Sequence, residues 1–309
     1  MVGVLNSIFI IVLTVESMIS IAGNVFIALV NCMDWMKRRK GCFVDQILTS
    51  LAISRIALLC SALTHTLLYA THPGSLKTAN IIRMTTVSWF VTNHFNIWLA
   101  MCLNLFYFLK IANFSNFIFL YLKRRVKKVV LVILLMSLVL LLFNIIVIDI
   151  QTNVWIDGFR RNISYTSSMR NFKKLPRLLL FISSMFMILP FLVSLAACFL
   201  LIFSLWKHLK RMKRMQHNAK GPRDASTMAH MKAMQTVVTF FLLYTIYLLC
   251  LILQISSFEF LAEDQIIFFE HAIGIAFPSG HSLALISGNS KLTKAFFSVL
   301  WRLRCRPNA

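Results

Sequence analysis

The sequence predicts an all-α membrane protein, a bundle of seven transmembrane helices with the N-terminus outside and the C-terminus inside. Hydrophobic residues make up 59% of the 309 residues and charged residues only 14%, whereas soluble chains average about 45–50% and about 25%. Apolar stretches of the roughly 20 residues needed to cross a bilayer recur along almost the whole chain. A spanning segment must satisfy its own backbone polar groups, so each stretch is predicted to be a helix.

The predicted helices follow one another with short connections. They cover residues 5–31, 46–70, 84–110, 128–148, 178–206, 231–256 and 265–288, and residues 289–309 are expected to form a cytosolic tail. The N-terminus lacks the basic region of a cleaved signal peptide, so its apolar stretch is expected to stay as the first helix. Because no long linker or internal repeat interrupts this pattern, residues 1–309 are predicted to form a single seven-helix domain.

Lys and Arg residues set the predicted orientation. Most of them lie in alternate loops, at residues 37–40, 123–128, 207–232 and 291–306, and an excess of positive charge marks the cytosolic side. The net charge of +22 is therefore attributed to topology and to attraction by anionic lipids of the inner leaflet. It requires no nucleic-acid partner, although the basic loop 207–232 is also a candidate docking face for a cytosolic protein.

Polar residues within the first two helices indicate an internal hydrogen-bond cluster. Ser20 and Asn24 are four residues apart and share one face of the first helix. Arg55 lies deep in the second helix, at about the same depth as Asn24, and a charge at that depth needs an interior position and a partner. We predict that Arg55 meets Asn24 and the backbone of the seventh helix near Pro278 and Ser282. The alternative is that the Arg55 side chain extends to the cytosol.

The third helix carries a polar stripe. Steps of three and four residues place six side chains on one face: Trp89, Asn93, Asn96, Ala100, Asn104 and Tyr107. A face with three asparagines is not expected to contact lipid. The stripe either joins neighbouring helices by hydrogen bonds or lines a cavity at its outer end.

Estimated depths favour a cavity at the outer end of this stripe. Trp89, Asn93, Tyr247 and Glu270, from three helices, are predicted to reach one layer of the outer half. Aromatic walls with a few polar groups are typical of small-molecule sites, and Glu270 would favour cationic or hydrogen-bond-donating ligands. The alternative is that these side chains only pack the helices together.

Enzyme, cofactor and metal sites are not predicted. The chain has no His-Glu-x-x-His motif, no Gly-x-Ser-x-Gly motif and no phosphate-binding glycine-rich loop. Haem ligation by His65, His94, His271 and His281 does not fit, because their estimated depths do not form two levels. A seven-helix transporter or channel remains the alternative function, but only Pro190 and Pro278 interrupt spans, in helices that do not pair as inverted halves.

Two covalent features are predicted outside the helices. Asn162-Ile-Ser164 is an N-glycosylation acceptor, in a loop that the charge pattern independently places outside. None of the cysteines falls in a predicted outer loop, so no extracellular disulfide is expected. Cys305 lies in a basic run after the last helix, where it is either palmitoylated or an unmodified thiol.

Several runs resemble the type 2 bitter taste receptor family, and the resemblance extends over all seven predicted helices. They are Leu51-Ala-Ile-Ser-Arg55, Phe106-Tyr-Phe-Leu-Lys-Ile-Ala-Asn-Phe-Ser115, Phe203-Ser-Leu-Trp-Lys-His208, His230-Met-Lys-Ala233, Pro278-Ser-Gly-His-Ser282 and Asn289-Ser-Lys-Leu292. As in that family, the third helix does not end in Asp-Arg-Tyr and the seventh lacks Asn-Pro-x-x-Tyr. One departure is Val25, which stands where the family usually has a second glycine.

The resemblance implies a G-protein-coupled receptor at the plasma membrane that detects bitter small molecules and activates a gustducin-like heterotrimeric G protein. It also implies the inner network, the glycan and the outer cavity described above. We expect agonists to shift a population of conformations through an activation network of Asn24, Arg55, Tyr244, Pro278, His281 and Ser282. The G protein is then expected to dock beside Tyr107, Lys110, Lys123, His208 and His230.

Overall fold

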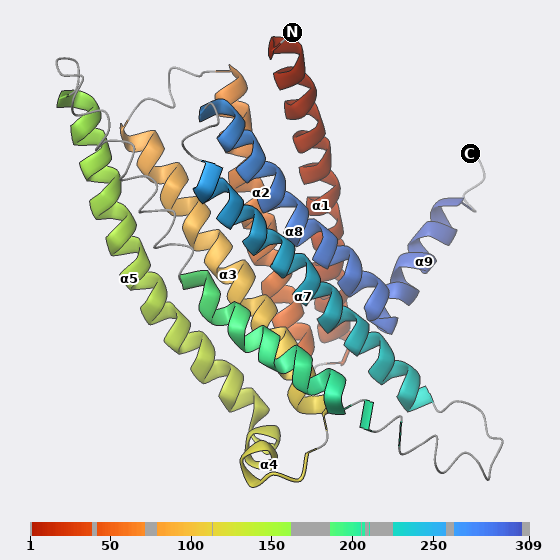
Figure 1. Cartoon of the computed structure of the whole chain (residues 1–309). Coiled ribbons are helices and arrows are strands. Elements are labelled where there is room, and N and C mark those ends of the chain that lie inside the picture. The colour runs from red at the N-terminus through yellow and green to blue at the C-terminus, as the bar shows by residue number, and fades with distance from the viewer. Residues whose placement is uncertain are drawn as a thin grey trace, which may run out of the picture.

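The chain forms a bundle of long helices in the computed structural model (Figure 1), which describes residues 2–38, 42–71, 79–112, 114–161, 186–204, 206–207, 210, 225–257 and 263–304. Within these ranges, the side chains of some residues are not described. The long helices are α1 (Val2–Arg38), α2 (Phe43–Thr71), α3 (Ala79–Ile111), α5 (Val126–Arg161), α7 (Ala225–Ser257) and α8 (Glu263–Gly288). A further helix covers Phe186–Ser204, and it is called helix 186–204 below.

The long helices alternate in direction along the bundle (Figure 1). We call the end at which α1 begins the upper end and the opposite end, where α4 lies, the lower end. Among the described residues, five helical stretches are long and apolar enough to cross a membrane, and shorter apolar stretches lie in α7 and α8. The prediction of an all-helical membrane protein is thus confirmed.

α3 lies at the centre of the bundle and α5 at its edge. The apolar span of α3 is 72% buried, whereas that of α5 is only 22% buried. Leu142 and Phe143 of α5 are 63% and 57% exposed, although both are large and apolar. Soluble proteins avoid such a continuous apolar surface, so this surface is the one that lipid covers.

The main core cluster follows the lower half of α3, from Ile97 to Leu109. Leu51 of α2, Leu103 of α3 and Phe240 of α7 are fully buried in it. α3 contacts α2, α5 and α7, while α1 packs against α2 and α8. This arrangement places the polar stripe of α3 inside the bundle.

The long helices α1, α2, α3, α5, α7 and α8 are all longer than predicted, α1 and α5 by the most. A hydrophobicity pattern ends with the lipid core, while a helix continues until its backbone is interrupted. α1 extends to Arg38 and α5 to Arg161, beyond the predicted ends at residues 31 and 148. The additional turns of α5 include Asp149, whose carboxylate lies 2.6 Å from the Arg83 guanidinium of α3. This ion pair joins α3 to α5 near the upper end.

Two helices at the lower end lie in segments that were predicted as a loop and as a tail. α4 covers Phe117–Arg124, and the side chain of Asn116 caps it by accepting the Ile118 N–H at 2.9 Å. α9 covers Ser290–Arg304, and the Asn289 Oδ1 atom accepts the Lys291 N–H at 3.0 Å. Asparagine is a favourable N-cap residue, so both capping asparagines were signals in the sequence.

Candidate functional site

Arg55 is the centre of a buried hydrogen-bond network between helices. Its side chain is completely buried. Its Nε atom donates to Asn96 Oδ1 of α3 at 3.0 Å, and its Nη1 atom donates to Ser282 Oγ of α8 at 2.8 Å. Its Nη2 atom lies 2.5 Å from His281 Nδ1. Ser282 Oγ also lies 2.9 Å from Asn24 Oδ1, so the network joins α1, α2, α3 and α8.

The partners in this network differ in detail from the predicted ones. We predicted a contact with the backbone of the seventh helix, whereas the structure has the side chains of His281 and Ser282 in that position. Asn24 is connected to Arg55 through Ser282, and its amide donates to the Ser20 carbonyl at 2.8 Å. The planar guanidinium has five N–H donors in a fixed arrangement, which suits contacts with several helices at once.

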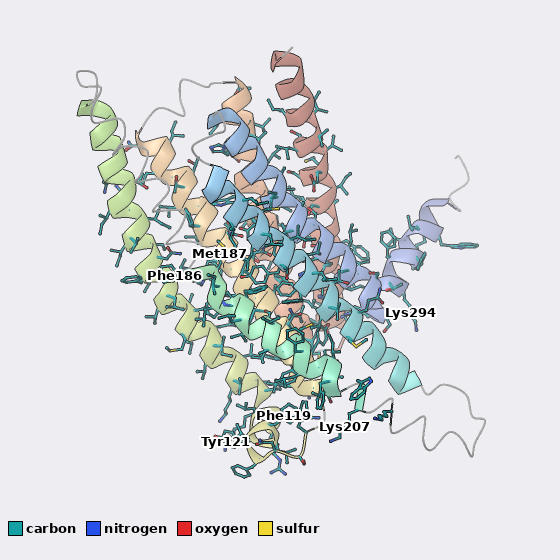
Figure 2. All side chains as sticks on the ribbon, in the orientation of Figure 1. Phe119, Tyr121, Phe186, Met187, Lys207 and Lys294 are labelled. Atoms are coloured by element: carbon teal, nitrogen blue, oxygen red, sulfur yellow. The ribbon has the colours of Figure 1, made fainter. Side chains whose placement is uncertain are left out.

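An aromatic cluster adjoins this network on the side of α7. Tyr244 is fully buried, and its hydroxyl donates to the Met187 carbonyl of helix 186–204 at 2.7 Å. The Tyr244 ring contacts Phe240 and Phe277, and the Phe240 ring lies 4.8 Å from that of His281. Tyr244 and His281 are therefore linked through one phenylalanine ring. Met187 lies at the upper end of helix 186–204 (Figure 2).

Two of the four predicted ligand residues contact each other directly. The Asn93 amide donates to the Tyr247 hydroxyl at 3.0 Å, and both side chains are buried. The Tyr247 ring also stacks on Phe277 at 5.3 Å. The bond joins α3 to α7 about one turn above the level of Arg55 and Asn96.

Trp89 lies one turn above Asn93 and packs towards α8. It borders a cluster formed by Leu13, Leu59 and Ile275. Its indole occupies the space beside Gly274, where an added Cβ atom would lie 2.8 Å from Trp89 Cζ2. The fourth predicted residue, Glu270, belongs to α8, but its side chain lies outside the described part of the structure.

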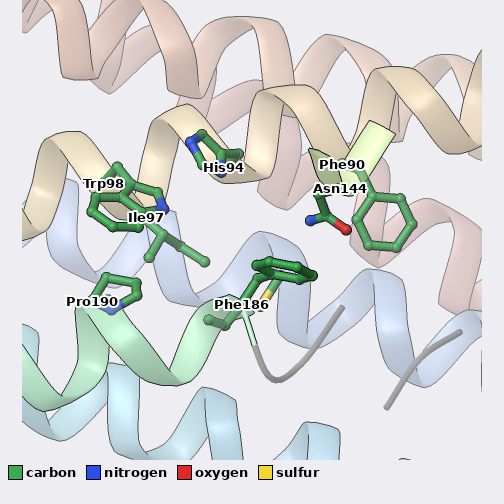
Figure 3. A pocket seen from close by; sticks show the side chains of 8 residues that line it. Phe90, His94, Ile97, Trp98, Asn144, Phe186 and Pro190 are labelled. Atoms are coloured by element: carbon green, nitrogen blue, oxygen red, sulfur yellow. The ribbon is translucent and has the colours of Figure 1, made fainter. Parts of the chain in front are cut away.

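A small cleft lies between α3, α5 and helix 186–204 (Figure 3), and sequence reasoning did not predict it. Its lining residues are Phe90, His94, Ile97, Trp98, Asn144, Phe186, Met187 and Pro190. His94 stacks on Trp98 at 5.6 Å. The buried His94 Nε2 and Asn144 Oδ1 atoms have no hydrogen-bond partner among the described residues, and the cleft has room for little more than a water molecule.

Lys291 holds α9 against α1 and α2 at the lower end. Its ammonium group lies 2.9 Å from Asp34 Oδ2 of α1 and 3.1 Å from Asp45 Oδ2 of α2. It also donates to Asn31 Oδ1 at 3.1 Å. Sequence reasoning missed this cluster because it counted Lys291 only as a basic residue of the tail.

Of the predicted G-protein residues, Tyr107, Lys110 and Lys123 have described side chains, and they lie near the lower end of the bundle. Tyr107 is partly buried, and Lys110 is exposed with its ammonium group 5.9 Å from the Phe106 ring centre. Lys123 of α4 donates to the Ala112 carbonyl at 2.7 Å, which ties α4 to the end of α3. His208 and the His230 side chain lie outside the described part of the structure. The same is true of the predicted glycan site Asn162 and of Cys305.

Metal and cofactor sites were not predicted. Within the described ranges, no group of three or more His, Cys, Asp or Glu residues has an arrangement suited to a metal ion. The cysteines of these ranges, at positions 32, 42, 60, 102, 198 and 250, are all unpaired. The buried polar groups near the centre of the bundle are therefore mainly amides, hydroxyls, imidazoles and one guanidinium.

Comparison with known proteins assigns the family. The taste receptor protein (TAS2R) family matches residues 1–304. Taste receptor type 2 member 14 of Macaca mulatta is 52% identical over 304 residues, covering 98% of this chain and 94% of that protein. Member 140 of Rattus norvegicus is 51% identical over 299 residues, covering 97% and 95%. Member 14 of Homo sapiens is 50% identical over 302 residues, covering 98% and 94%.

These matches span nearly the full length of the chain and agree with its helical membrane fold. They assign a receptor function and no enzymatic one. The chain therefore belongs to the TAS2R family of bitter taste receptors, which are seven-transmembrane G-protein-coupled receptors.

Proposed function

We propose that this receptor binds bitter small-molecule agonists in an outer cavity and activates a gustducin-like heterotrimeric G protein. In this proposal, residues 1–309 act as one domain with the N-terminus outside. The ligand residues are Trp89, Asn93, Tyr247 and Glu270. The bond between Asn93 and Tyr247, at 3.0 Å, supports the proposal most directly, because it places a polar pair from two helices beside aromatic rings. Such a composition suits orientation of a mainly apolar ligand.

The activation step in this proposal is a shift between two arrangements of the helices. An agonist must bind one arrangement more tightly than the other for the population to change. The residues that distinguish the two arrangements are Asn24, Arg55, Tyr244, Pro278, His281 and Ser282. Their hydrogen bonds connect α1, α2, α3 and α8, and the Tyr244 bond connects α7 to helix 186–204.

The lower end of the bundle is the cytosolic face in this proposal. The G protein docks beside Tyr107, Lys110, Lys123, His208 and His230. The exposed basic residues of α4 and α9 support this orientation, because anionic inner-leaflet lipids attract such residues by about 1 kcal/mol each. Lys294 and Lys207 are exposed there and lie at this end in Figure 2.

The test is a calcium-release assay in cells that supply a chimeric G protein, with a panel of bitter compounds. Tyr247→Phe removes the acceptor of the Asn93 amide and leaves a buried donor unpaired, which costs about 1–3 kcal/mol. Because Tyr247 is proposed to contact the agonist, we expect the loss of its hydroxyl to reduce potency about tenfold, since 1.4 kcal/mol of ligand contact corresponds to a factor of ten. Asn93→Ala is expected to act in the same direction.

Thr92→Val is the matched control for this assay. The Thr92 hydroxyl donates to the Ser88 carbonyl within its own helix at 2.8 Å, so its loss leaves the contact between α3 and α7 intact. Cell-surface expression is measured for all variants. Unchanged potency of Tyr247→Phe and Asn93→Ala for several agonists, at normal surface expression, contradicts the proposed site. A response that persists without the chimeric G protein contradicts the proposed coupling.

A further inference from the structure

Asn144 is a buried polar residue on a helix whose outer surface is apolar. Its neighbours along α5, Phe143 and Ile146, are exposed, whereas the Asn144 side chain is buried. Ser137 lies seven residues earlier and is also buried. Residues seven apart lie on the same side of a helix, so Asn144 and Ser137 share the face of α5 that is turned away from lipid. α3 is the helix that packs against α5 here.

The His94 ring of α3 already has one partner on this face. It donates a hydrogen bond to the backbone carbonyl of Ser137. Its Nε2 atom is buried without a partner among the described residues, so the donor is Nδ1. In a neutral imidazole that carries its proton on Nδ1, the Nε2 atom can only accept. His94 therefore presents a buried acceptor on the ring nitrogen that Ser137 does not contact.

Asn144 approaches the His94 ring from the upper side. α5 runs from the lower to the upper end (Figure 1), and helical side chains lean towards the N-terminus of their helix, which for Asn144 is the direction of Ser137. The Asn144 Oδ1 atom is a second buried acceptor without a partner in the described part of the chain. Both side chains line the same cleft (Figure 3). Two acceptors cannot bond to each other, so this pair needs a donor between them.

We propose that one water molecule binds in this cleft and donates one hydrogen bond to His94 Nε2 and the other to Asn144 Oδ1. The cleft has room for a molecule of this size, and water offers two O–H donors. The hydroxyl of an alcohol has only one donor, and a halide anion has none. A cation would bring an uncompensated charge into the interior, because no carboxylate is among the described residues that line the cleft.

The water molecule joins α5 to α3 near the middle of the membrane. His94 lies eleven residues after Arg83, about 16 Å along α3, and so far below the ion pair of Arg83 with Asp149. Unpaired polar groups are costly in a medium that offers no hydrogen bonds, so the bridge stabilises one orientation of Asn144. The exposed apolar side of α5 provides no directional contact, and the bridge therefore limits rotation of α5 about its own axis.

A double-mutant cycle in thermal unfolding of the purified receptor, without agonist or G protein, tests the bridge. Asn144→Leu removes one acceptor and His94→Phe removes the other. Loss of the Ser137 bond occurs in both receptors that carry His94→Phe, so it cancels in the cycle. Asn144→Leu alone leaves a buried acceptor of His94 unpaired. We expect the change in unfolding temperature caused by Asn144→Leu to be several degrees more negative in the unmodified receptor than in the background of His94→Phe.

Thr152→Val is the matched control within the same helix. Thr152 is buried like Asn144, but its hydroxyl donates to the Ile148 carbonyl of α5 itself at 2.8 Å. Its removal does not concern the contact with α3. Thr152→Val should therefore change the unfolding temperature equally with and without His94→Phe.

Solid-state NMR of the receptor with isotope-labelled histidine identifies the donor. The spectrum of His94→Phe shows which signal belongs to His94, and magnetisation transfer from water protons to that signal reports a bound water molecule. We expect transfer to His94 Nε2 in the unmodified receptor and its loss in Asn144→Leu. Thr152→Val should retain the transfer.

Each outcome of these experiments decides the question. An equal effect of Asn144→Leu in both backgrounds overturns the proposal. A difference between the backgrounds without transfer from water also overturns it, because His94 and Asn144 are then coupled in another way. If His94→Phe cannot be obtained folded, loss of a water-to-histidine transfer in Asn144→Leu decides alone. Because agonist and G protein are absent, the result is independent of the proposed ligand site and coupling.

Discussion

Gly274→Ala is a direct test of the position of Trp89, because it adds one methyl group without removing any polar contact. The new Cβ atom would lie 2.8 Å from Trp89 Cζ2, whereas carbon atoms normally approach to about 3.5–4.0 Å. The Trp89 Cη2 atom would lie closer still, so the indole must move by more than about 1 Å. Overpacking of this kind costs about 1–3 kcal/mol, and the better helix propensity of alanine offsets about 1 kcal/mol.

Gly23→Ala is the matched control for this variant. A Cβ atom at Gly23 has no neighbour within 4 Å, so only the helix propensity changes, and we expect stabilisation by about 0.5–1 kcal/mol. The two variants should then differ in stability by about 1–3 kcal/mol, a difference that thermal unfolding of the purified receptors can measure.

Agonist responses provide the second measurement for Gly274→Ala. If Trp89 forms part of the ligand site, a displaced indole should reduce agonist potency about tenfold, which corresponds to 1.4 kcal/mol. The assay is a concentration series of calcium release, normalised to surface expression. The reasoning is refuted if Gly274→Ala matches Gly23→Ala in both unfolding temperature and potency.

Three further predictions concern the network, the lower end and the predicted glycan. Arg55→Ala should lower signalling about tenfold or more for every agonist, because charge-assisted hydrogen bonds are worth about 1.5–3 kcal/mol each; a loss confined to some agonists argues against a shared network. Lys291→Ala should destabilise the receptor by about 1 kcal/mol, as measured by unfolding, whereas exposed Lys294→Ala should have almost no effect. Glycosidase treatment should increase the electrophoretic mobility of the expressed receptor but not of Asn162→Gln, and equal mobility of treated and untreated receptor contradicts a glycan.

The helical membrane fold could be predicted from the sequence because its main signal is local. Each span can be recognised from about 20 consecutive apolar residues, and no information about neighbouring helices is needed. The ends of α1 and α5 were less predictable, since their last turns leave the hydrophobic pattern while the backbone continues as a helix. α4 and α9 were missed because they are short and lie outside the apolar stretches.

The partners of buried polar residues were harder to predict than their burial. The helical period of α3 places Asn93 and Asn96 on one stripe, but it does not say which helix each one faces. In the structure, Asn93 bonds to Tyr247 of α7 and Asn96 bonds to Arg55 of α2. Three residues rotate the helix by about 300°, so the two side chains point about 60° apart and can face different helices. The pairing of Lys291 with Asp34 and Asp45 likewise depends on how α9 folds back, and no periodicity encodes that.

The helix α8 connects the upper and lower parts of the bundle physically. Trp89 packs at Gly274, and Arg55 binds His281 seven residues later, about 10 Å along the helix at 1.5 Å per residue. Pro278 lies between them and has no N–H, so the backbone ladder is interrupted where the two contacts would have to move relative to each other. A change at Trp89 can therefore tilt the upper part of α8 without breaking its lower contacts at once. We expect agonist binding to affect the lower end of the bundle when that tilt alters the bond between Arg55 and His281. If α8 were rigid, the contact at Gly274 and the bond at His281 could not move relative to each other.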